Sequence, residues 1–309
     1  MTVSDPDRVR SLDELADWQF EGTALAVLGS PIAHSVSPAM HNTALNLMAQ
    51  TQQIFRDWRY FKFDVPPENL PEALERLYAA NFVGINLTIP HKVHAVDLVC
   101  EIDPEARLSG AVNTLHRRAD GWAGFNTDGF GMEQGVRREL KAELTGADVL
   151  LLGAGGAARA AAIQCLASGC RSLFIGNRNQ ERLAGLMAQL EPAEGYKRVR
   201  SFDLAEPPGD LPSDAVVINA TSLGLKEEDP APIDVSLLRG SPKIYDMTYG
   251  VVNALAQAAK DHGLAYADGL SMLVWQGARS LEIWTGALVP AQAMMQGACH
   301  AKGYSLRQA

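Results

Sequence analysis

Short apolar runs alternate with longer amphipathic segments along this chain. A run such as 24–28 is too short for a buried helix and leads into turn-forming residues, which is typical of a strand. In the segment 70–81, by contrast, Leu70, Leu74 and Leu77 recur at helical spacing. The same reasoning predicts strands at 24–28, 58–65, 84–88, 111–117, 121–125, 149–152, 172–176, 215–218 and 243–246, and helices at 38–49, 70–81, 129–140, 157–168, 180–190, 253–262, 272–285 and 291–302.

This succession of strands and helices indicates the α/β fold class, with two open-sheet αβ domains. A chain of 309 residues is also longer than a single hydrophobic core usually grows. We expect residues 1–127 to form one domain and residues 128–268 to form the other. The helices within 269–309 are expected to return to the first domain.

The segment 149–178 carries the most specific motif. An apolar run leads directly into Gly153, Gly155 and Gly156, and an alanine-rich segment and a second apolar run follow. Strand, glycine turn, helix and strand in this order are typical of dinucleotide binding, so we expect residues 128–268 to be a Rossmann-type nucleotide-binding domain and residues 1–127 to be the substrate-binding and catalytic domain. The glycines let the backbone approach a pyrophosphate, whose charge is met by the amides at the helix N-terminus.

The second strand of this motif predicts which dinucleotide is bound. It ends at Asn177, with Arg178 and Arg182 close behind in the sequence. An NAD-binding domain usually carries an acidic residue at this point, which binds a ribose hydroxyl. Two guanidinium groups and no carboxylate suit a 2′-phosphate instead, so we predict NADP (NADPH) as the cofactor, with NAD possible.

Polar residues also follow the strands expected in the first domain. Lys92 comes shortly after the strand at 84–88, and Asn113 and Asp128 lie in turn-like surroundings. Such groups at strand ends face one crevice in an open α/β sheet. Hydroxyls and amides suit a polyhydroxylated substrate, and a lysine can hold a carboxylate or move a proton. Ser37 precedes Pro38, which is typical of a helix start, so we also expect its hydroxyl to cap that helix.

Composition and charge narrow the class of protein. A net charge of −9 argues against a nucleic-acid partner. No apolar stretch is long enough to cross a membrane, and the first residues lack the apolar core of a signal peptide, so we expect a cytoplasmic protein. The four cysteines show no paired spacing. His91 and His94 lack a third ligand at a telling spacing, so no metal site is predicted.

Eight motifs in order resemble those of the shikimate dehydrogenase family, which includes shikimate and quinate dehydrogenases. The resemblance extends from about Gly29 to Pro290. The motifs are Gly-Ser-Pro-Ile-Ala-His-Ser-Val-Ser-Pro-Ala-Met-His-Asn at 29–42, Asn-Leu-Thr-Ile-Pro-His-Lys at 86–92, Gly-Ala-Val-Asn-Thr at 110–114, Asn-Thr-Asp at 126–128, the glycine turn, Asn-Ala-Thr-Ser-Leu-Gly-Leu at 219–225, Tyr-Asp-Met-Thr-Tyr at 245–249 and Asp-Gly-Leu-Ser-Met-Leu-Val-Trp-Gln at 268–276.

The resemblance implies an NADP-dependent oxidoreductase that reduces 3-dehydroshikimate reversibly to shikimate in aromatic amino acid (chorismate) biosynthesis, as a monomer or homodimer. Lys92 would be the catalytic proton-transfer residue, with Asp128 as its coupled partner. The implied substrate-binding residues are Ser35, Ser37, Thr88, Asn113, Asp128, Tyr249 and Gln276. The implied cofactor-binding residues are Gly153, Ala154, Gly155, Gly156, Ala157, Asn177, Arg178, Arg182, Thr221, Ser222, Met247 and Gly269.

Some positions depart from the family pattern. The run after Tyr249 lacks the proline that the family often has there, Asn179 replaces a common threonine, and Ser271 replaces a frequent glycine. These departures leave open an NAD-dependent quinate/shikimate dehydrogenase of catabolism. A nucleotide-binding regulatory protein without turnover is a third alternative, but the presence of both Lys92 and Asp128 counts against it.

Overall fold

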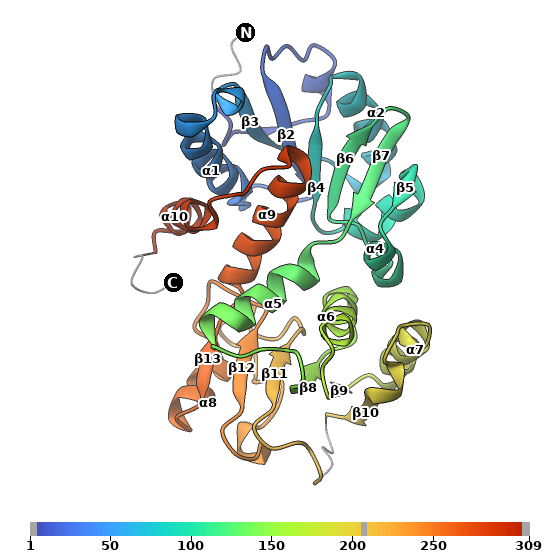
Figure 1. The fold of residues 1–309 in the computed structure, drawn as a ribbon, viewed down its shortest axis with the longest axis vertical. Coiled ribbons are helices and arrows are strands. Elements are labelled where there is room, and N and C mark those ends of the chain that lie inside the picture. Colours follow the sequence, from blue (N-terminus) through green and yellow to red (C-terminus); the bar gives the residue numbers. More distant parts are fainter. Residues whose placement is uncertain (1–4, 205–208, 305–309) are drawn as a thin grey trace. The chain divides into compact units, whose positions relative to one another are not determined.

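The computed structural model describes residues 5–204 and 209–304. The chain divides into two compact units (Figure 1). Unit 1 comprises residues 1–127 and 276–309, and unit 2 comprises residues 128–275. The chain therefore passes from one unit to the other twice, at the start of helix α5 and within helix α9.

Unit 1 is built on a seven-stranded mixed sheet with the order β1-β3-β2-β4-β6-β7-β5. Strands β6 and β7 form an antiparallel hairpin, β6 also runs antiparallel to β4, and the other neighbours pair in parallel. The strands are β1 (Val9–Arg10), β2 (Thr23–Gly29), β3 (Trp58–Asp64), β4 (Gly84–Leu87), β5 (Glu101–Ile102), β6 (Thr114–Arg118) and β7 (Gly121–Phe125).

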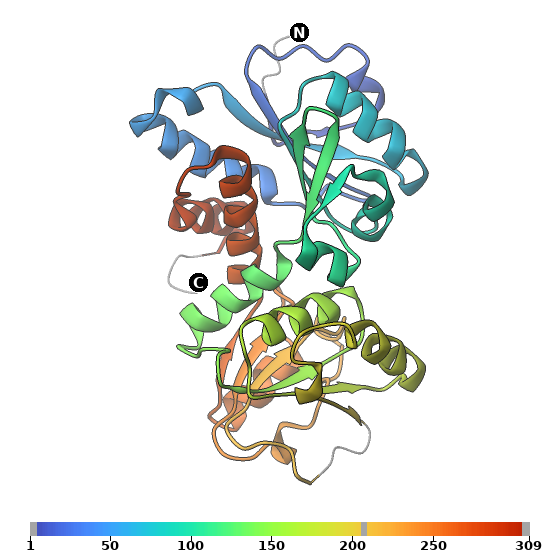
Figure 2. The same cartoon turned by 45° about the vertical axis from the view of Figure 1, so that its right-hand side comes forward.

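Helices cover both faces of this sheet (Figure 2). Leu70, Leu74 and Leu77 bury one face of α2 against the sheet residues Phe61 and Ile85. Helices α1 and α10 pack against each other, and α1 also contacts β3. The helices of this unit are α1 (Ser37–Thr51), α2 (Leu70–Ala79), α3 (His91–His94), α4 (Pro104–Ser109), the second part of α9 (Leu270–Thr285) and α10 (Ala291–Lys302).

Helix α1 corrects one expectation about Ser37. The helix begins at Ser37 itself, Val36 occupies the N-cap position, and no side chain caps the helix there. The backbone N–H of Ser37 instead donates to Oγ of Ser35, over 3.3 Å. The serine two residues earlier therefore provides the hydroxyl acceptor at this helix start.

Unit 2 is a doubly wound α/β domain. All strand pairs of its six-stranded sheet are parallel, in the order β10-β9-β8-β11-β12-β13. Numbered within the unit, this is the order 3-2-1-4-5-6 of a dinucleotide-binding Rossmann domain. Its elements are α5 (Asp128–Glu139), β8 (Asp148–Leu152), α6 (Gly156–Ala167), β9 (Ser172–Asn177), α7 (Gln180–Leu190), β10 (Val199–Asp203), β11 (Val216–Asn219), β12 (Lys243–Asp246), α8 (Ala254–Asp261), β13 (Ala265–Ala267) and the first part of α9.

The central strands of unit 2, such as β8 and β11, are continuous apolar runs because both of their faces are buried. Leu150, Val217 and Ile244 join Leu255 of α8 in one core cluster. On α5, Gly135 allows a close approach, because a Cβ there would collide with the hydroxyl of Tyr245.

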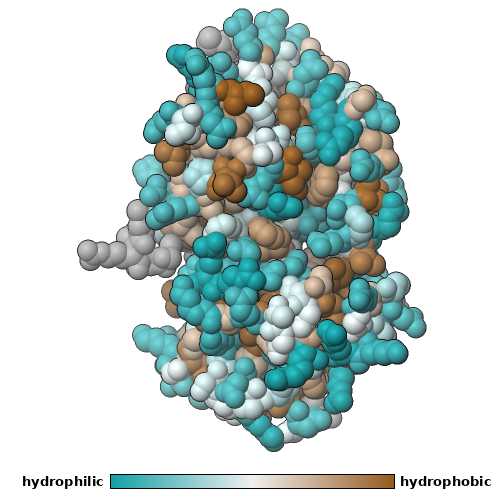
Figure 3. Space-filling view, in the orientation of Figure 1, coloured by the Kyte–Doolittle hydropathy of each residue, from teal (hydrophilic) through white to brown (hydrophobic). Residues whose placement is uncertain are grey.

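The surface is mainly hydrophilic on the face drawn in Figure 3, with apolar residues interspersed among polar ones. None of the helices in the described part of the chain combines the length and apolar character needed to cross a bilayer.

Candidate active site

In unit 2, a hollow of about 570 Å³ lies at the carboxyl ends of β8, β9 and β11. The strand order reverses between β8 and β11, and ligands of open α/β sheets bind at such a switch point. Eight of the predicted cofactor residues line this hollow: Gly153, Ala154, Gly155, Asn177, Arg178, Arg182, Thr221 and Ser222. Gly156, Ala157, Met247 and Gly269 are not among its lining residues.

The glycine positions in the turn after β8 differ in how much space there is for a side chain. Gly153 has φ +120°, and a Cβ there would lie 2.8 Å from the carbonyl oxygen of Ala220, so the fold itself requires glycine. A Cβ on Gly155 or Gly156 would meet no atom within 4 Å. Gly155 is the N-cap of the twelve-residue helix α6. The open space therefore lies where helix N–H groups can bind an anion.

The other side of the hollow is formed by the start of α7. Asn179 caps this helix, since its Oδ1 accepts from the backbone N–H of Arg182 over 2.8 Å. The side-chain amide of Asn177 donates to the carbonyl oxygen of Asn179 over 2.8 Å, which fixes the turn. Arg178 and Arg182 are exposed, and no Asp or Glu is among the described residues that line the hollow. The electrostatics therefore favour a phosphate over a sugar hydroxyl.

The loop after β11 is held by a buried polar network. Asn219 Oδ1 accepts from the backbone N–H and the hydroxyl of Thr221, and its amide donates to Asp246 over 2.9 Å. Asn219 and Asp246 are both fully buried. The position of Thr221 in the hollow is thus set from the ends of two strands.

Met247 and Gly269 come together elsewhere in unit 2. Met247 follows β12, and Gly269 precedes α9. A Cβ on Gly269 would collide with the carbonyl oxygen of Met247. Two cofactor residues predicted from separate motifs therefore touch through their backbones.

In unit 1, Thr88 and Lys92 follow the end of β4. The N–H of Thr88 donates to the carbonyl oxygen of Leu28 over 3.0 Å, and the Thr88 methyl lies where a Cβ on Gly29 would stand. The carbonyl oxygen of Lys92 accepts from the N–H of Val112 over 2.7 Å. These bonds fix Thr88 against the end of β2 and Lys92 against the 110–114 motif.

Asn113 is held by hydrogen bonds of both its backbone and its side chain. It is 1% exposed, and its backbone bonds both Leu87 and Phe125. Its side-chain amide donates to Oε1 of Gln276 over 3.2 Å and to the hydroxyl of Thr127 over 3.0 Å. The structure thus brings together Asn113 and Gln276, which lie 163 positions apart in the sequence.

Asp128 and Tyr249 belong to unit 2. Asp128 is the first residue of α5 and is buried, whereas Tyr249 is half-buried in the segment after β12. Of the two histidines considered as metal ligands, His91 is buried and His94 is exposed. Within residues 5–204 and 209–304, no group of three His, Cys, Asp or Glu side chains could hold a metal ion.

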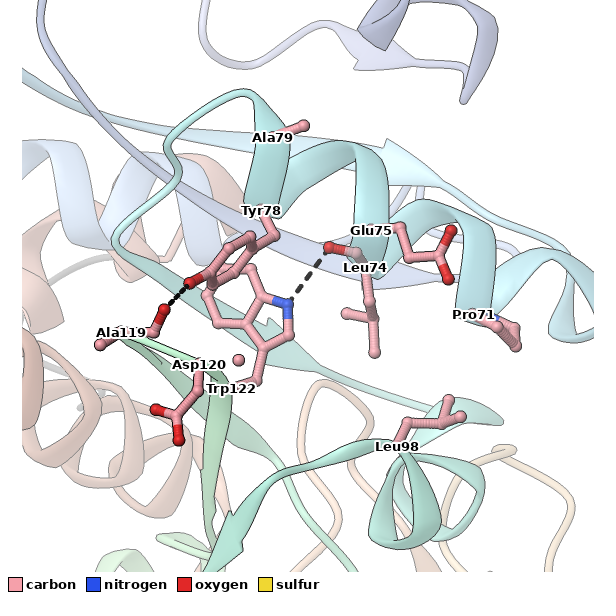
Figure 4. A pocket seen from close by; sticks show the side chains of 10 residues that line it. Pro71, Leu74, Glu75, Tyr78, Ala79, Leu98, Ala119, Asp120 and Trp122 are labelled. Atoms are coloured by element: carbon pink, nitrogen blue, oxygen red, sulfur yellow. Dashed lines mark hydrogen bonds between the residues drawn. The ribbon is translucent and has the colours of Figure 1, made fainter.

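A second hollow, of about 520 Å³, lies between α2 and the β6–β7 hairpin in unit 1 (Figure 4). It contains none of the predicted site residues. The hydroxyl of Tyr78 donates to the carbonyl oxygen of Ala119, and the indole N–H of Trp122 donates to that of Leu74. Its aromatic polar groups are thus used within the protein, and the switch-point hollow is the better candidate for a nucleotide.

Comparison with known proteins places the chain in a family. Three family models match, described as the shikimate dehydrogenase substrate binding domain (residues 27–115), shikimate/quinate 5-dehydrogenase (136–224) and the shikimate 5′-dehydrogenase C-terminal domain (269–296). Shikimate dehydrogenase (NADP(+)) from Geobacter metallireducens is 37% identical over 270 residues, which cover 86% of this chain and 92% of the relative. The chain belongs to the shikimate dehydrogenase family.

Two further similarities agree with this membership. Shikimate dehydrogenase (NADP(+)) from Symbiobacterium thermophilum is 38% identical over 287 residues, covering 90% of this chain and 94% of the relative. Shikimate 5-dehydrogenase from Thermus thermophilus, solved in complex with NADP(H) and shikimate, matches with a TM-score of 0.77 and 34% identity, covering 90% of this chain and 99% of that one. The family and the α/β fold class predicted from the sequence are confirmed, and the chain is an oxidoreductase.

The structure shows further residues in the hollow where the predicted cofactor residues lie. Asn179, Leu204, Ala220 and Leu223 also line the switch-point hollow. An Asn directly before a helix is a capping signal, so Asn179 could have been found from the sequence. Leu204 follows β10, a strand that the hydrophobic pattern did not predict, so the sequence offered no signal for it.

Proposed function

We propose that this member of the shikimate dehydrogenase family is an NADP-dependent shikimate dehydrogenase of aromatic amino acid biosynthesis. The observation that carries the proposal is the hollow after β8, where open glycines face Arg178 and Arg182 with no carboxylate in the described lining. The names of the relatives support shikimate as the substrate. We assign substrate binding to unit 1 and NADP binding to unit 2.

The residues of unit 2 fit the cofactor. A methyl group on Gly155 would enter open space, which is where a pyrophosphate would bind the N–H groups of residues 155–157. Arg178 and Arg182 would hold the 2′-phosphate, and Asn177 would lie beside the ribose. Thr221 and Ser222 would line the cofactor, with Met247 and Gly269 near the nicotinamide. NADPH supplies a hydride, and NADP⁺ accepts one in the reverse direction.

The residues of the substrate site bind and orient. Ser35 and Ser37 would hold the carboxylate of 3-dehydroshikimate, and Thr88, Asn113, Gln276 and Tyr249 would hold its hydroxyl side. When a hydride reaches the ketone carbon, negative charge develops on the oxygen and must be met by a proton. Lys92 would donate that proton, and Asp128 would orient the ammonium group and share the proton with it.

The test is the initial rate of nicotinamide reduction by the purified protein with shikimate, run in parallel with NADP⁺ and NAD⁺. We expect a clear rate with NADP⁺ and a much lower one with NAD⁺. A rate that favours NAD⁺, or quinate over shikimate, would move the protein to the catabolic branch. No rate with any pair would contradict the proposed substrate.

A further inference from the structure

A buried chain of hydrogen bonds leads from β3 to the predicted substrate residues of unit 1. The hydroxyl of Tyr60 donates to Oδ1 of Asn86 over 2.8 Å. The amide Nδ2 of Asn86 donates to the hydroxyl of Ser280 over 3.0 Å, across 194 positions of sequence. Tyr60 and Ser280 are fully buried and Asn86 is 6% exposed. Polar groups at this depth are costly unless each is paired, so the arrangement is strongly determined.

The direction of the hydrogen bonds in this buried chain can be followed by counting the protons that each group can donate. Because Asn86 Oδ1 accepts from Tyr60, its Nδ2 end faces Ser280 and Thr114. The hydroxyl of Thr114 donates to Oδ1 of Asn113 over 2.9 Å. A hydroxyl carries one proton, and in the 2.7 Å contact between Ser280 and Thr114 either oxygen can be the donor; when Thr114 donates to Asn113, Ser280 is the donor here. Ser280 also lies 3.0 Å from the carbonyl oxygen of Gln276, which is a second acceptor for the same proton.

The last hydrogen bonds of this buried chain fix the orientation of the side-chain amide of Asn113. Its Oδ1 accepts from the hydroxyl of Thr114 and from the backbone N–H of Thr127, the latter over 2.9 Å. Its Nδ2 therefore lies on the side of Gln276, whose Oε1 accepts from it. An asparagine amide can adopt either of two flipped orientations, and here the buried partners select the one in which its nitrogen faces Gln276 and Thr127.

We infer that Ser280 and Thr114 are positioning residues that hold Asn113 in the orientation in which its amide donates to Gln276, and so set the geometry of two predicted substrate residues. This inference rests on the proposed function. Both residues are predicted to hold the hydroxyl side of the substrate, so a change in the orientation of the pair should weaken binding of the substrate hydroxyl beside them.

The test compares two buried serines on one helix. Ser280→Ala removes a member of the chain, whereas Ser271→Ala removes a buried hydroxyl that bonds only Tyr245 among the contacts described for it. We expect Ser280→Ala to lower kcat/KM for shikimate about tenfold, as loss of one oriented hydrogen bond would. KM for NADP⁺ should stay the same. Discrimination against an analogue without the hydroxyl next to the reacting one should shrink by a similar factor, and Ser271→Ala should change neither quantity.

A double-variant comparison separates positioning from general destabilisation. If Ser280 acts through Asn113, Ser280→Ala should have almost no further effect on kcat/KM in an Asn113→Ala background. Additive losses would overturn the inference. Thr114→Val, which keeps the shape but lacks the hydroxyl, gives the same test should Ser280→Ala fold poorly.

A measurement without substrate keeps this inference distinct from the proposed function. In the isotopically labelled protein, the Asn113 side-chain N–H groups should exchange slowly with solvent, and roughly tenfold faster or more in Ser280→Ala, because loss of one hydrogen bond of the chain frees the amide. Equal exchange in both proteins would overturn the inference even if the enzyme is active. A wild-type protein inactive with shikimate, but with this difference in exchange, would overturn the proposed substrate alone.

Discussion

Lys92 carries the proton-transfer step of the proposed reaction. Its backbone is fixed by the bond from Val112, so replacing the side chain leaves the local structure in place. We expect Lys92→Ala to lower kcat by about 10²–10⁴-fold, the usual contribution of a general acid or base. Shikimate binding should persist, because Ser35, Ser37 and Asn113 remain.

Steady-state kinetics and calorimetric titration with shikimate measure these two effects separately. The control is Lys302→Ala, which replaces a lysine in the last turn of α10. Lys62 is less suitable as a control because it is buried. Turnover of Lys92→Ala at the wild-type rate would contradict the assignment and revive the alternative of a nucleotide-binding regulatory protein.

Arg178 determines the choice of cofactor if it binds the 2′-phosphate. It is exposed at the edge of the hollow, so Arg178→Ala should cost little stability. A hydrogen bond to a charged group contributes about 1.5–3 kcal/mol, so we expect KM for NADP⁺ to rise about 10- to 100-fold. KM for NAD⁺, which lacks the phosphate, should hardly change.

The matched control is Arg137→Ala, which removes a half-exposed arginine of the same unit that pairs with Glu133 and Glu143 outside the hollow. Parallel kinetics with both cofactors give the result. Equal losses with NADP⁺ and NAD⁺ would show that Arg178 supports the site in general and does not select the phosphate.

Single residues differ in how far the sequence reveals them. Gly153, Arg178 and Lys92 stand in motifs whose neighbours are local, so a short stretch of sequence was enough to select them. Ser280 has no such motif. Its partners Asn86 and Thr114 lie 194 and 166 positions away, and only the folded sheet brings them to one helix.

At the scale of an element, the turn from β8 to α6 separates the needs of folding from those of binding. Gly153 has positive φ and backbone atoms close to its Cα, whereas Gly155 has an ordinary backbone conformation and open space beside it. We expect Gly153→Ala to lower the free energy of unfolding by about 2–4 kcal/mol, through strain and the clash with Ala220.

Gly155→Ala should change the free energy of unfolding by less than about 1 kcal/mol, yet raise KM for NADP⁺ at least about tenfold. Urea unfolding and NADP⁺ kinetics on both variants provide the comparison. Unimpaired NADP⁺ binding by Gly155→Ala would mean that the open space beside this glycine does not receive the pyrophosphate.

The elements themselves could be predicted where they are long and apolar. The expected helix at 38–49 is α1 at 37–51, and the expected strand at 172–176 is β9 at 172–177. Strand β10 was not predicted, since Arg200 and Ser201 are exposed on this edge strand and interrupt the apolar pattern. Strands β1 and β5 have two residues each, too few for any periodicity.

At the scale of the whole molecule, the sequence predicted the class of sheet but not the order of all its strands. The alternation of strand and helix predicted open sheets, and unit 2 has the parallel doubly wound order that such alternation favours. The hairpin of β6 and β7 is local, with Asp120-Gly121 as its turn signal in the sequence, whereas the antiparallel pairing of β6 with β4 joins segments that are not consecutive in the chain and that no local pattern relates. The same limit applies to α9, one helix whose residues belong to two units.

The stability of the whole molecule should depend on pH through the fully buried His41 and the half-buried His116. His41 is fully buried, stacks on the ring of Tyr60 at 4.0 Å, and bonds the carbonyl oxygen of Ser37. Burial lowers the pKa of His41 from 6.5 to about 4. Burial also lowers the pKa of His116 to about 4, with the nearby Arg118 acting in the same direction. Both side chains are therefore neutral in the folded protein at pH values where an unfolded chain would already be protonated.

The sign of the effect follows from proton binding. Between about pH 6.5 and pH 4 the unfolded chain binds more protons at His41 than the folded protein does, so stability falls as the pH falls through this range and is constant above it. For His41 alone the loss of stability between about pH 8 and pH 5 should be on the order of 2 kcal/mol.

Urea unfolding at several pH values measures this loss of stability. In His41→Gln, the slope of the free energy of unfolding against pH should be smaller than in the wild type, by an amount that corresponds to at most one bound proton. His262→Gln, at an exposed site in unit 2, should keep the wild-type slope. A wild-type slope retained in His41→Gln would show that His41 is not a source of the acid sensitivity.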